Sequence, residues 1–254
     1  MKGTILFDSK EHAGTITIKN PEKLNCFDLS MINELDKLLD KIKKSDLKVI
    51  IIKGSGKSFC AGGDISWEKQ VGSLSLQKAK EQMNFVQSVF SKIENLPQAV
   101  IAVINGHAVG GGNELAMACD MRIALPSAKF IHPETSLGTV APLGGTKRLP
   151  RLIGLGKAKY MLFTGRVIDS KTALEWGLVD FLVAEDKIDS FLGDLVSEIA
   201  KKPVKALELT KKSVNSDYLK DLQDDFEAES YIKCSRTKEN SEILKGFLRK
   251  KKIN

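Results

Sequence analysis

The stretch of this sequence that is most informative about the fold is a glycine-rich segment that follows an apolar run. The segment spans residues 105–116 and reads NGHAVGGGNELA, and the run before it spans residues 99–104 and reads AVIAVI. A continuous apolar run of this length suits a strand that is buried on both faces. We therefore predict a strand, a glycine-rich turn and then a helix that begins near Gly111.

The start of that helix would place two chemical groups side by side. The amide N–H of Gly111 would lie at the positive end of the helix, where it can polarise an oxygen that gains negative charge. Glu114 follows three residues later, on nearly the same helical face. A donor and a carboxylate would thus point to one spot, although glycines can simply form turns and the helix dipole alone favours a Glu in the first turn.

A second glycine-rich turn comes soon after another apolar run. The turn is FCAGGDI at residues 59–65, and the run is VIII at residues 49–52. Glycine has no Cβ, so backbone N–H groups in both turns could approach a ligand closely. A further acid, Glu134 in HPET, precedes GGT at residues 144–146, and by itself it could be a solvated loop residue. Together these features favour a site over a set of unrelated turns.

Two nucleotide-binding motifs are absent on inspection. GSGKS at residues 54–58 resembles the end of a phosphate-binding loop, but that pattern needs a glycine where the chain has Ile51. The stretch 106–112 lacks the G-x-G-x-x-G spacing of a dinucleotide-binding turn. Chemistry that depends on a nucleoside triphosphate or on nicotinamide is therefore disfavoured.

The rest of the chain alternates strand and helix patterns, which predicts an α/β protein. Strands are expected at 15–19, 49–52, 99–104, 121–125, 129–131 and 178–183, and helices at 29–42, 76–95 and 111–119. From residue 145 the pattern is mostly helical. Residues 186–252 carry almost no strand signal, which predicts a helical extension of one domain.

Composition limits the class of protein. Hydrophobic residues make up 42% of the chain, and no apolar run approaches the roughly 20 residues that a membrane span needs. The N-terminus has no signal-peptide pattern and the four cysteines are scattered, so we expect a cytoplasmic protein with reduced thiols and no membrane partner. The three histidines form no cluster, so we expect no metal site.

The charge balance is basic, with 39 Lys and Arg against 32 Asp and Glu and a formal net charge of +7. Such an excess could attract nucleic acid, an anionic membrane or a small polyanion, or it could be an ordinary lysine-rich surface. Aromatic residues are only 6% of the chain and no RNA-binding signature is present, so a basic nucleic-acid-binding protein is the disfavoured, non-enzymatic alternative.

At these motifs the sequence resembles the crotonase superfamily, also called the enoyl-CoA hydratase/isomerase family, from about residue 4 to 252. The motifs that carry the resemblance are LN at 24–25, FCAGGDI at 59–65, the stretch 105–120, PE at 133–134, GGTKRL at 144–149, TG at 164–165, Ala173 and GLV at 177–179. Their number and their shared order make chance a poor explanation.

The resemblance implies a fold, an assembly and a ligand. It implies a spiral of ββα repeats over residues 1–185 that binds acyl-CoA, and a helical trimerisation region over residues 186–254. The family assembles as a homotrimer or as a hexamer, a dimer of trimers. Its ligand is an acyl-CoA thioester, in which coenzyme A enters with the substrate, so no further cofactor, no metal, no nucleic acid and no membrane partner are expected.

The resemblance also assigns roles to individual positions. Gly63 and Gly111 match the two amides of the family's oxyanion hole, and Glu114 and Glu134 match the two acids of its hydratases. The positions that match CoA-contacting segments are Leu24, Asn25, Ala61, Asp64, Ile65 and, toward a neighbouring subunit, Phe247 and Lys250 within FLRKKK. Trp67, Met83, Phe85 and Pro142 lie where the family builds its acyl pocket.

The expected function is that of an enoyl-CoA hydratase. Adding water to a 2-enoyl thioester needs an oxyanion hole for the enolate, a base for the water and an acid for the α-carbon. Both acids are present, whereas family members that only shift a double bond typically keep the one that matches Glu134. Pro142 departs from the family's glycine-rich loop, which leaves an enoyl-CoA isomerase or an acyl-CoA hydrolase open as alternatives.

Overall fold

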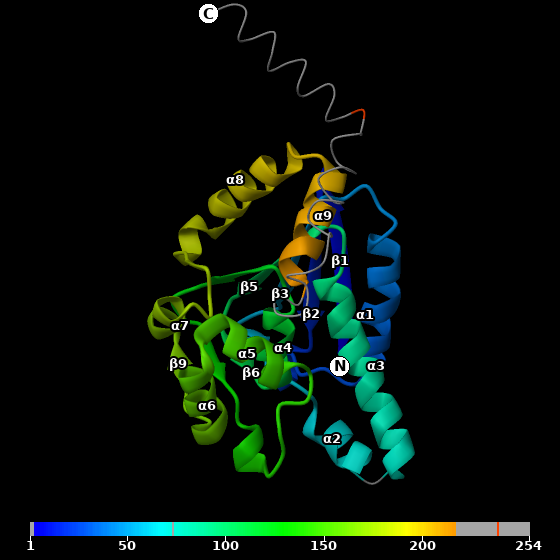
Figure 1. The fold of residues 1–254 in the computed structure, drawn as a ribbon, viewed down its shortest axis with the longest axis vertical. Helices are drawn as coiled ribbons and strands as arrows, with labels where there is room; N and C mark the ends of the chain where they lie inside the picture. Colours follow the sequence, from blue (N-terminus) through cyan, green and yellow to red (C-terminus); the bar gives the residue numbers. More distant parts are fainter. Residues whose placement is uncertain (1–2, 73, 217–237, 239–254) are drawn as a thin grey trace, which may run out of the picture.

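Two β-sheets lie next to each other at the centre of the structure, a computed structural model that describes residues 3–72, 74–216 and 238 (Figure 1). The larger sheet has the order β1 (Thr4–Lys10), β2 (Ala13–Lys19), β3 (Val49–Gly54), β5 (Ala99–Ile104), β7 (Met121–Ala124) and β10 (Phe181–Leu182). The smaller sheet has the order β4 (Ser58–Cys60), β6 (His107–Val109), β8 (Lys129–Ile131) and β9 (Ile168–Asp169). Only the pairs β1–β2 and β8–β9 are antiparallel among these strands.

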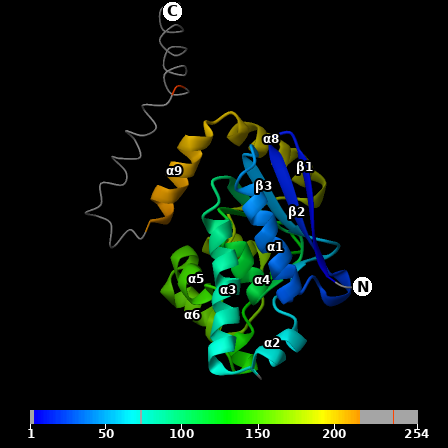
Figure 2. The same ribbon diagram turned by 90° about the vertical axis from the view of Figure 1, so that its right-hand side faces the viewer.

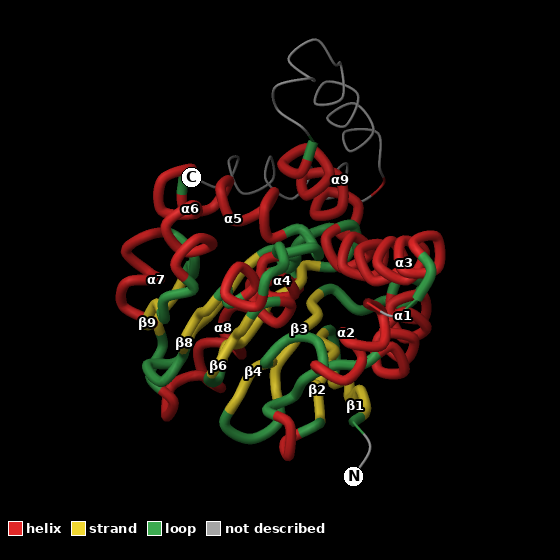
Figure 3. The backbone as a smooth tube through the Cα atoms, turned by 90° about the horizontal axis from the view of Figure 1, so that it is seen from below, coloured by secondary structure: helices red, strands yellow, loops and turns green. Residues whose placement is uncertain are grey.

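The order of the strands along the chain makes the architecture a spiral. Three strands of the larger sheet each lead into a short strand of the smaller one, β3 to β4, β5 to β6 and β7 to β8, and helical segments then return the chain. Figure 3 shows β4, β6 and β8 in sequence, with α4 (Gly111–Met117) beside them. The predicted α/β fold of ββα repeats is therefore confirmed.

Helices cover both faces of the larger sheet. The helix α1 (Leu29–Ile42) begins where the Asp28 side chain accepts a hydrogen bond from the Met31 amide, and it lies beside α3 (Leu76–Glu94) (Figure 2). On the opposite face α8 (Ile188–Ala200) packs its apolar side against residues of β3, β5 and β7. The parallel strands are thus buried on both sides, as their continuous apolar sequences require.

The remaining elements surround the smaller sheet and the ends of the strands. They are η1 (Pro21–Lys23), α2 (Ile65–Gly72), η2 (Glu134–Leu137), α5 (Gly145–Ile153), α6 (Leu155–Thr164), α7 (Ser170–Trp176), η3 (Glu185–Lys187) and α9 (Val204–Asn215). Within the described residues, none of the helices is both long and apolar enough to cross a membrane.

Several sequence-based expectations need correction. The segments that became β4 and β6 were expected to be turns, because three-residue strands next to glycine carry no periodic signal. The strand expected over 178–183 is reduced to Phe181–Leu182, because Leu178 folds back after Gly177 and donates its amide to Ala173 of α7. The helix expected over 111–119 ends at Met117. Of the helical extension over 186–252, α8 and α9 are confirmed, and the remainder lies outside the described residues.

Candidate active site

A cavity of about 570 Å³ opens where the two glycine-rich turns meet α2, α3 and the loop after β8. Its lining includes two acids, Glu114 and Glu134, amid glycines and apolar side chains. The other lining residues are Phe27, Ala61, Gly62, Gly63, Ile65, Trp67, Val71, Met83, Val109, Gly110, Gly111, Pro133, Leu137, Thr139, Val140, Pro142 and Leu143. The cavity therefore combines an apolar wall with a few polar groups, which is typical of a small-molecule site.

The two glycine-rich turns touch through their backbones. The strands β4 and β6 pair in parallel, and a Cβ on Gly112 would collide with the Cys60 carbonyl oxygen. A Cβ on Gly62, whose φ is +88°, would lie 3.2 Å from the Gly111 amide nitrogen. Only glycine permits this approach, and it brings residues about 50 positions apart to one wall of the cavity.

Two amide groups on this wall are not used by the secondary structure around them. Gly111 is the first residue of α4, where amide N–H groups have no acceptor within the helix. The bridge between Phe27 and Gly63 is made by the amides of Phe27 and Asp64, at 2.9 and 2.8 Å from their acceptors, and does not engage the Gly63 amide. Both glycines line the cavity, so both N–H groups can serve a ligand oxygen.

Glu114 is the more deeply buried of the two acids. Its side chain is 0% exposed, and its Oε1 accepts hydrogen bonds from the amides of Leu143 and Gly145, both at 2.7 Å. Its Oε2 has no hydrogen-bond partner among the described residues. Burial is the main cause that raises the pKa of Glu114 to about 7. One oxygen is thus held and the other is left for a ligand or a water molecule.

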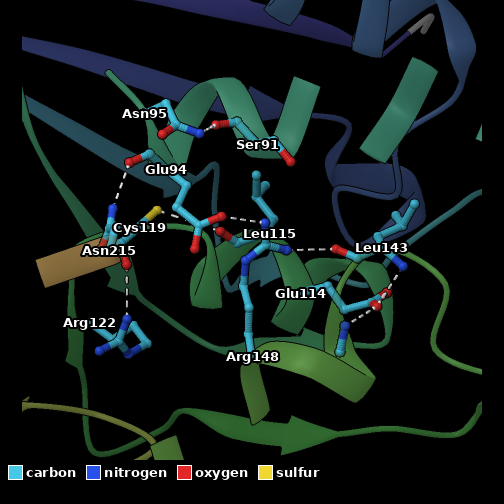
Figure 4. Close-up of polar contacts among 11 residues, drawn as sticks. Ser91, Glu94, Asn95, Glu114, Leu115, Cys119, Arg122, Leu143, Arg148 and Asn215 are labelled. Atoms are coloured by element: carbon cyan, nitrogen blue, oxygen red, sulfur yellow. Dashed lines mark hydrogen bonds and ion pairs between the residues drawn. The ribbon is translucent and has the colours of Figure 1, made fainter. Parts of the chain in front are cut away.

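The loop that holds Glu114 is itself fixed by charged side chains (Figure 4). Arg148 donates from Nη1 to the Leu143 carbonyl at 2.9 Å, and its Nη2 forms an ion pair with Glu94 of α3 at 2.7 Å. The Leu143 carbonyl therefore accepts a hydrogen bond from Arg148, and the Leu143 amide donates one to Glu114. Arg148 thus has a structural role, connecting α5 to α3 behind the acid.

Glu134 is the first residue of η2 and lies at the end of a buried polar chain. Its carboxylate oxygens lie 3.2 and 3.3 Å from Nδ1 of His132, and Nε2 of His132 lies 3.1 Å from Nδ2 of Asn113 on α4. His132 and Asn113 are both 0% exposed, and Glu134 is 7% exposed. The absence of a side chain at Gly110 leaves space for Glu134, since a Cβ there would lie 3.1 Å from Oε1 of Glu134.

The residues matched to CoA-contacting segments fall into two groups. Leu24 and Ile65 are exposed, at 53% and 64%, and Ile65 lines the cavity. Asn25 is fully buried instead, and its side chain bonds to backbone or hydroxyl groups of the turns around it, at Asn20, Ser55 and Ser58. Asn25 thereby supports the loop, in which it and Leu24 both have positive φ.

The turn at 61–65 is tied to that loop from the other side. The Ala61 amide donates to the Leu24 carbonyl at 3.0 Å, and the Asp64 carboxylate pairs with Lys23 at 2.5 Å. Hydrogen bonding from Lys23 is the main cause that lowers the pKa of Asp64 to about 2. Phe247 and Lys250 lie outside the described residues.

Three of the four residues expected in the acyl pocket line the cavity: Trp67, Met83 and Pro142. Phe85 lies instead at a separate surface depression beside Leu29, because it projects from another side of α3. Trp67 is 8% exposed, and its Nε1 has no hydrogen-bond partner among the described residues. Pro142 accepts a hydrogen bond at its carbonyl from Gln87 of α3, which ties the loop before Leu143 to that helix.

Sequence reasoning missed four residues that shape this site. Phe27 packs its ring against Gly111 and contacts Trp67, with ring centroids 6.3 Å apart. Leu143 acts through its backbone amide, whereas His132 and Asn113 act through their buried side chains. The motifs HPE and GGNE contain His132 and Asn113, but nothing in their spacing shows that they meet across 19 positions.

Comparisons with known proteins agree with this arrangement. The chain matches the family model described as Enoyl-CoA hydratase/isomerase over residues 8–254. A short-chain-enoyl-CoA hydratase of Clostridium acetobutylicum is 34% identical, and a crotonyl-CoA hydratase of Syntrophomonas wolfei is 35% identical, each over 98% of this chain and 96% of the relative. The crystal structure of an enoyl-CoA hydratase from Bacillus anthracis is similar with a TM-score of 0.88 and 34% identity, over 97% of this chain and 96% of that chain. With its ββα spiral and its sequence matched almost throughout, the chain belongs to the enoyl-CoA hydratase/isomerase family.

Proposed function

We propose that this protein is an enoyl-CoA hydratase, which adds water across the 2,3-double bond of a 2-enoyl-CoA thioester and yields the 3-hydroxyacyl-CoA. The observation that carries the proposal is the placement of two acids, Glu114 and Glu134, in one cavity with the amides of Gly63 and Gly111. The names of the relatives from Clostridium acetobutylicum and Syntrophomonas wolfei support it.

The two amides would receive the thioester carbonyl. Hydration builds negative charge on that oxygen as an enolate forms, and two convergent N–H donors stabilise the charge by about 3 kcal/mol each. The Gly111 amide lies at the N-terminus of α4, so the positive end of the helix dipole also stabilises the charge on that oxygen. The apolar wall at Trp67 and Met83 would then take the acyl chain.

The two acids would divide the proton transfers. Oε2 of Glu114 takes a proton from water while the water oxygen bonds to C3, and the π electrons of the double bond move toward C2 and the carbonyl. Glu134 gives its proton to C2, so that one water is added in total, and the proton on Glu114 is passed back to Glu134 before the next turnover. A pKa near 7 suits Glu114 as a base at neutral pH, and the step calls for no metal or redox cofactor.

We place the coenzyme A part of the substrate along the segments at 23–25 and 61–65, where Leu24 and Ile65 are exposed. Lys250 and Phe247 of a neighbouring subunit would approach it, since CoA carries several phosphate charges. This requires self-association, and we propose a homotrimer or a dimer of trimers in the cytoplasm. The exposed side chains of Leu155 and Phe163 on α6, at 68% and 71%, support an apolar contact between subunits.

The proposal is tested by following the ultraviolet band of the enoyl thioester with short, medium and branched 2-enoyl-CoAs. The wild-type protein should consume at least one of them, and Glu114→Gln and Glu134→Gln should each lose activity by about 10²-fold or more. Glu198→Gln on the exposed side of α8 is the matched control and should retain activity.

Two results would contradict the proposal. Conversion of a 3-enoyl-CoA without consumption of any 2-enoyl-CoA would indicate an isomerase, and release of free CoA would indicate a hydrolase. Undiminished turnover in both Gln variants would instead reject the residue roles.

A further inference from the structure

The polar chain from Asn113 through His132 to Glu134 is buried, and only its last member, Glu134, has a role in the proposed reaction. His132 and Asn113 are completely shielded, yet they place two polar side chains in a row behind the acid that faces the cavity. Buried polar groups are costly unless they are paired, so a chain of this kind needs a reason. Nothing in the proposed proton transfers uses His132 directly.

The contacts around His132 favour one position for its proton. Nδ2 of Asn113 lies 3.1 Å from Nε2, and since an amide NH₂ group can only donate, this orientation of Asn113 makes Nε2 the acceptor. Turning the Asn113 amide around would leave its whole NH₂ group without a partner among the described residues, whereas the present orientation leaves only Oδ1 unpaired there. A neutral imidazole then carries its proton on Nδ1, which faces both carboxylate oxygens of Glu134 at 3.2 and 3.3 Å.

We propose that His132, oriented by Asn113, is a positioning residue that donates its Nδ1 proton to Glu134. This inference rests on the proposed hydratase function and extends it to the residues behind the acid. The donated hydrogen bond holds the carboxyl group toward the cavity. It also stabilises the carboxylate that Glu134 becomes after it has given its proton to C2, because hydrogen bonds to a charged group are the stronger ones.

The geometry distinguishes this role from simple packing. A packing role would require only the volume of the ring, whereas the proposed role requires a donor at the position of Nδ1. Asn and Leu have similar sizes, but Asn can present an N–H near the position of Nδ1 and Leu cannot. The pair of variants His132→Asn and His132→Leu therefore separates the two roles.

We expect His132→Leu to lower kcat by about 10- to 100-fold, the worth of one hydrogen bond to a charged group, and to change KM by less than about twofold. His132→Asn should recover most of the lost kcat. His12→Leu and His12→Asn, at the exposed turn between β1 and β2, are the matched controls and should behave as the wild type. Equal kcat in both His132 variants, or a loss confined to KM, would overturn the proposal.

A second measurement needs no substitution at His132 and so does not depend on how well His132→Leu folds. The chain has three histidines, so the ring nitrogens can be assigned by nitrogen-15 NMR with one His12 and one His107 variant. We expect His132 to be neutral with its proton on Nδ1 in the free protein. A proton on Nε2, or on both nitrogens, would overturn the proposal.

The failure of this inference differs from failure of the proposed function. If the wild-type protein hydrates no 2-enoyl-CoA, the function is wrong whatever the tautomer of His132. If the wild-type protein is active and the His132 variants match it, the function stands and the positioning role is rejected.

Discussion

Glu114 shows how a single residue acquires its chemistry from its surroundings. Its side chain is fully buried, one carboxylate oxygen is held by two amides, and burial outweighs those hydrogen bonds, so that its pKa rises to about 7. A carboxyl group in water would be ionised well below that pH and would be a weak base. The backbone amides of Leu143 and Gly145 orient the group, and the desolvation makes it basic.

The raised pKa of Glu114 predicts an acid limb in the pH profile. A base must be deprotonated, so kcat/KM should fall as the pH drops through about 7, by about tenfold for each further pH unit. The measurement is kcat/KM against pH with a 2-enoyl-CoA. A profile that is flat between pH 5.5 and 8 would show that Glu114 does not ionise in this range.

Gly145 should be irreplaceable for a steric reason. A Cβ at this position would lie 2.9 Å from Oε1 of Glu114 and 2.8 Å from Cβ of Ala141, closer than real Cβ contacts allow. Gly145→Ala should displace Glu114 and lower kcat/KM by about 10- to 100-fold, since small misplacements of reacting groups are costly. Gly156→Ala on α6, where a Cβ would meet open space, is the control. Equal activity in the two variants would argue against this steric role.

At the scale of elements, α9 is attached to the spiral by a few polar contacts. Lys211 pairs with Asp120 at 2.8 Å and donates to the Gln98 carbonyl at 3.0 Å, while Lys48 donates to the carbonyls of Ala200 and Lys202 before the helix. The Lys211 side chain is only 11% exposed, so its charge is desolvated and depends on Asp120. The neighbouring Lys212 pairs with Glu208 on the helix surface and is 47% exposed.

This contrast predicts unequal effects of two similar substitutions. Lys211→Met should lower the free energy of unfolding by about 2–3 kcal/mol, because it leaves the Asp120 carboxylate in a largely buried place without its partner. Lys212→Met should change it by less than about 0.5 kcal/mol, as is usual for an exposed ion pair. Urea unfolding of both variants measures the difference. Similar values would mean that Lys211 does not anchor α9.

Seen over the whole molecule, α6 and the segment after it present a surface with exposed apolar side chains. Leu155, Phe163 and Val167 are 68%, 71% and 57% exposed, although residues of this type are usually buried. They lie on the side of the molecule that carries α5, α6 and α7, away from α1 and α3 (Figure 1). Large apolar side chains exposed on one helix and the segment after it are candidates for a contact with another subunit.

The proposed trimer predicts that this surface is covered in solution. Phe163→Glu should shift the mass measured by light scattering toward that of one chain, 27.9 kDa, because it buries a charge in the contact. Leu6 is also exposed, on β1 at one edge of the larger sheet. Leu6→Glu is therefore the comparison and should leave the assembly intact. An unchanged mass for Phe163→Glu would place the subunit contact elsewhere.

The α/β class, the long parallel strands, the helices over 29–42 and 76–95, and the family could all be predicted from the amino-acid sequence. These features are local, since a continuous apolar run or a period of 3.6 residues is written in neighbouring positions. The motifs also identified both acids and both amides that line the cavity. Their catalytic roles stay predictions.

How those residues are held depends on contacts between segments that are distant in the sequence. The short strands β4 and β6 form because two glycine turns touch, Glu114 is bound by amides 29 and 31 positions away, and His132 meets Asn113 across 19 positions. No local pattern encodes such contacts. They depend on how the folded backbone brings distant segments together and on how deeply the side chains are then buried. Burial then raises the pKa of Glu114, which no motif could have revealed.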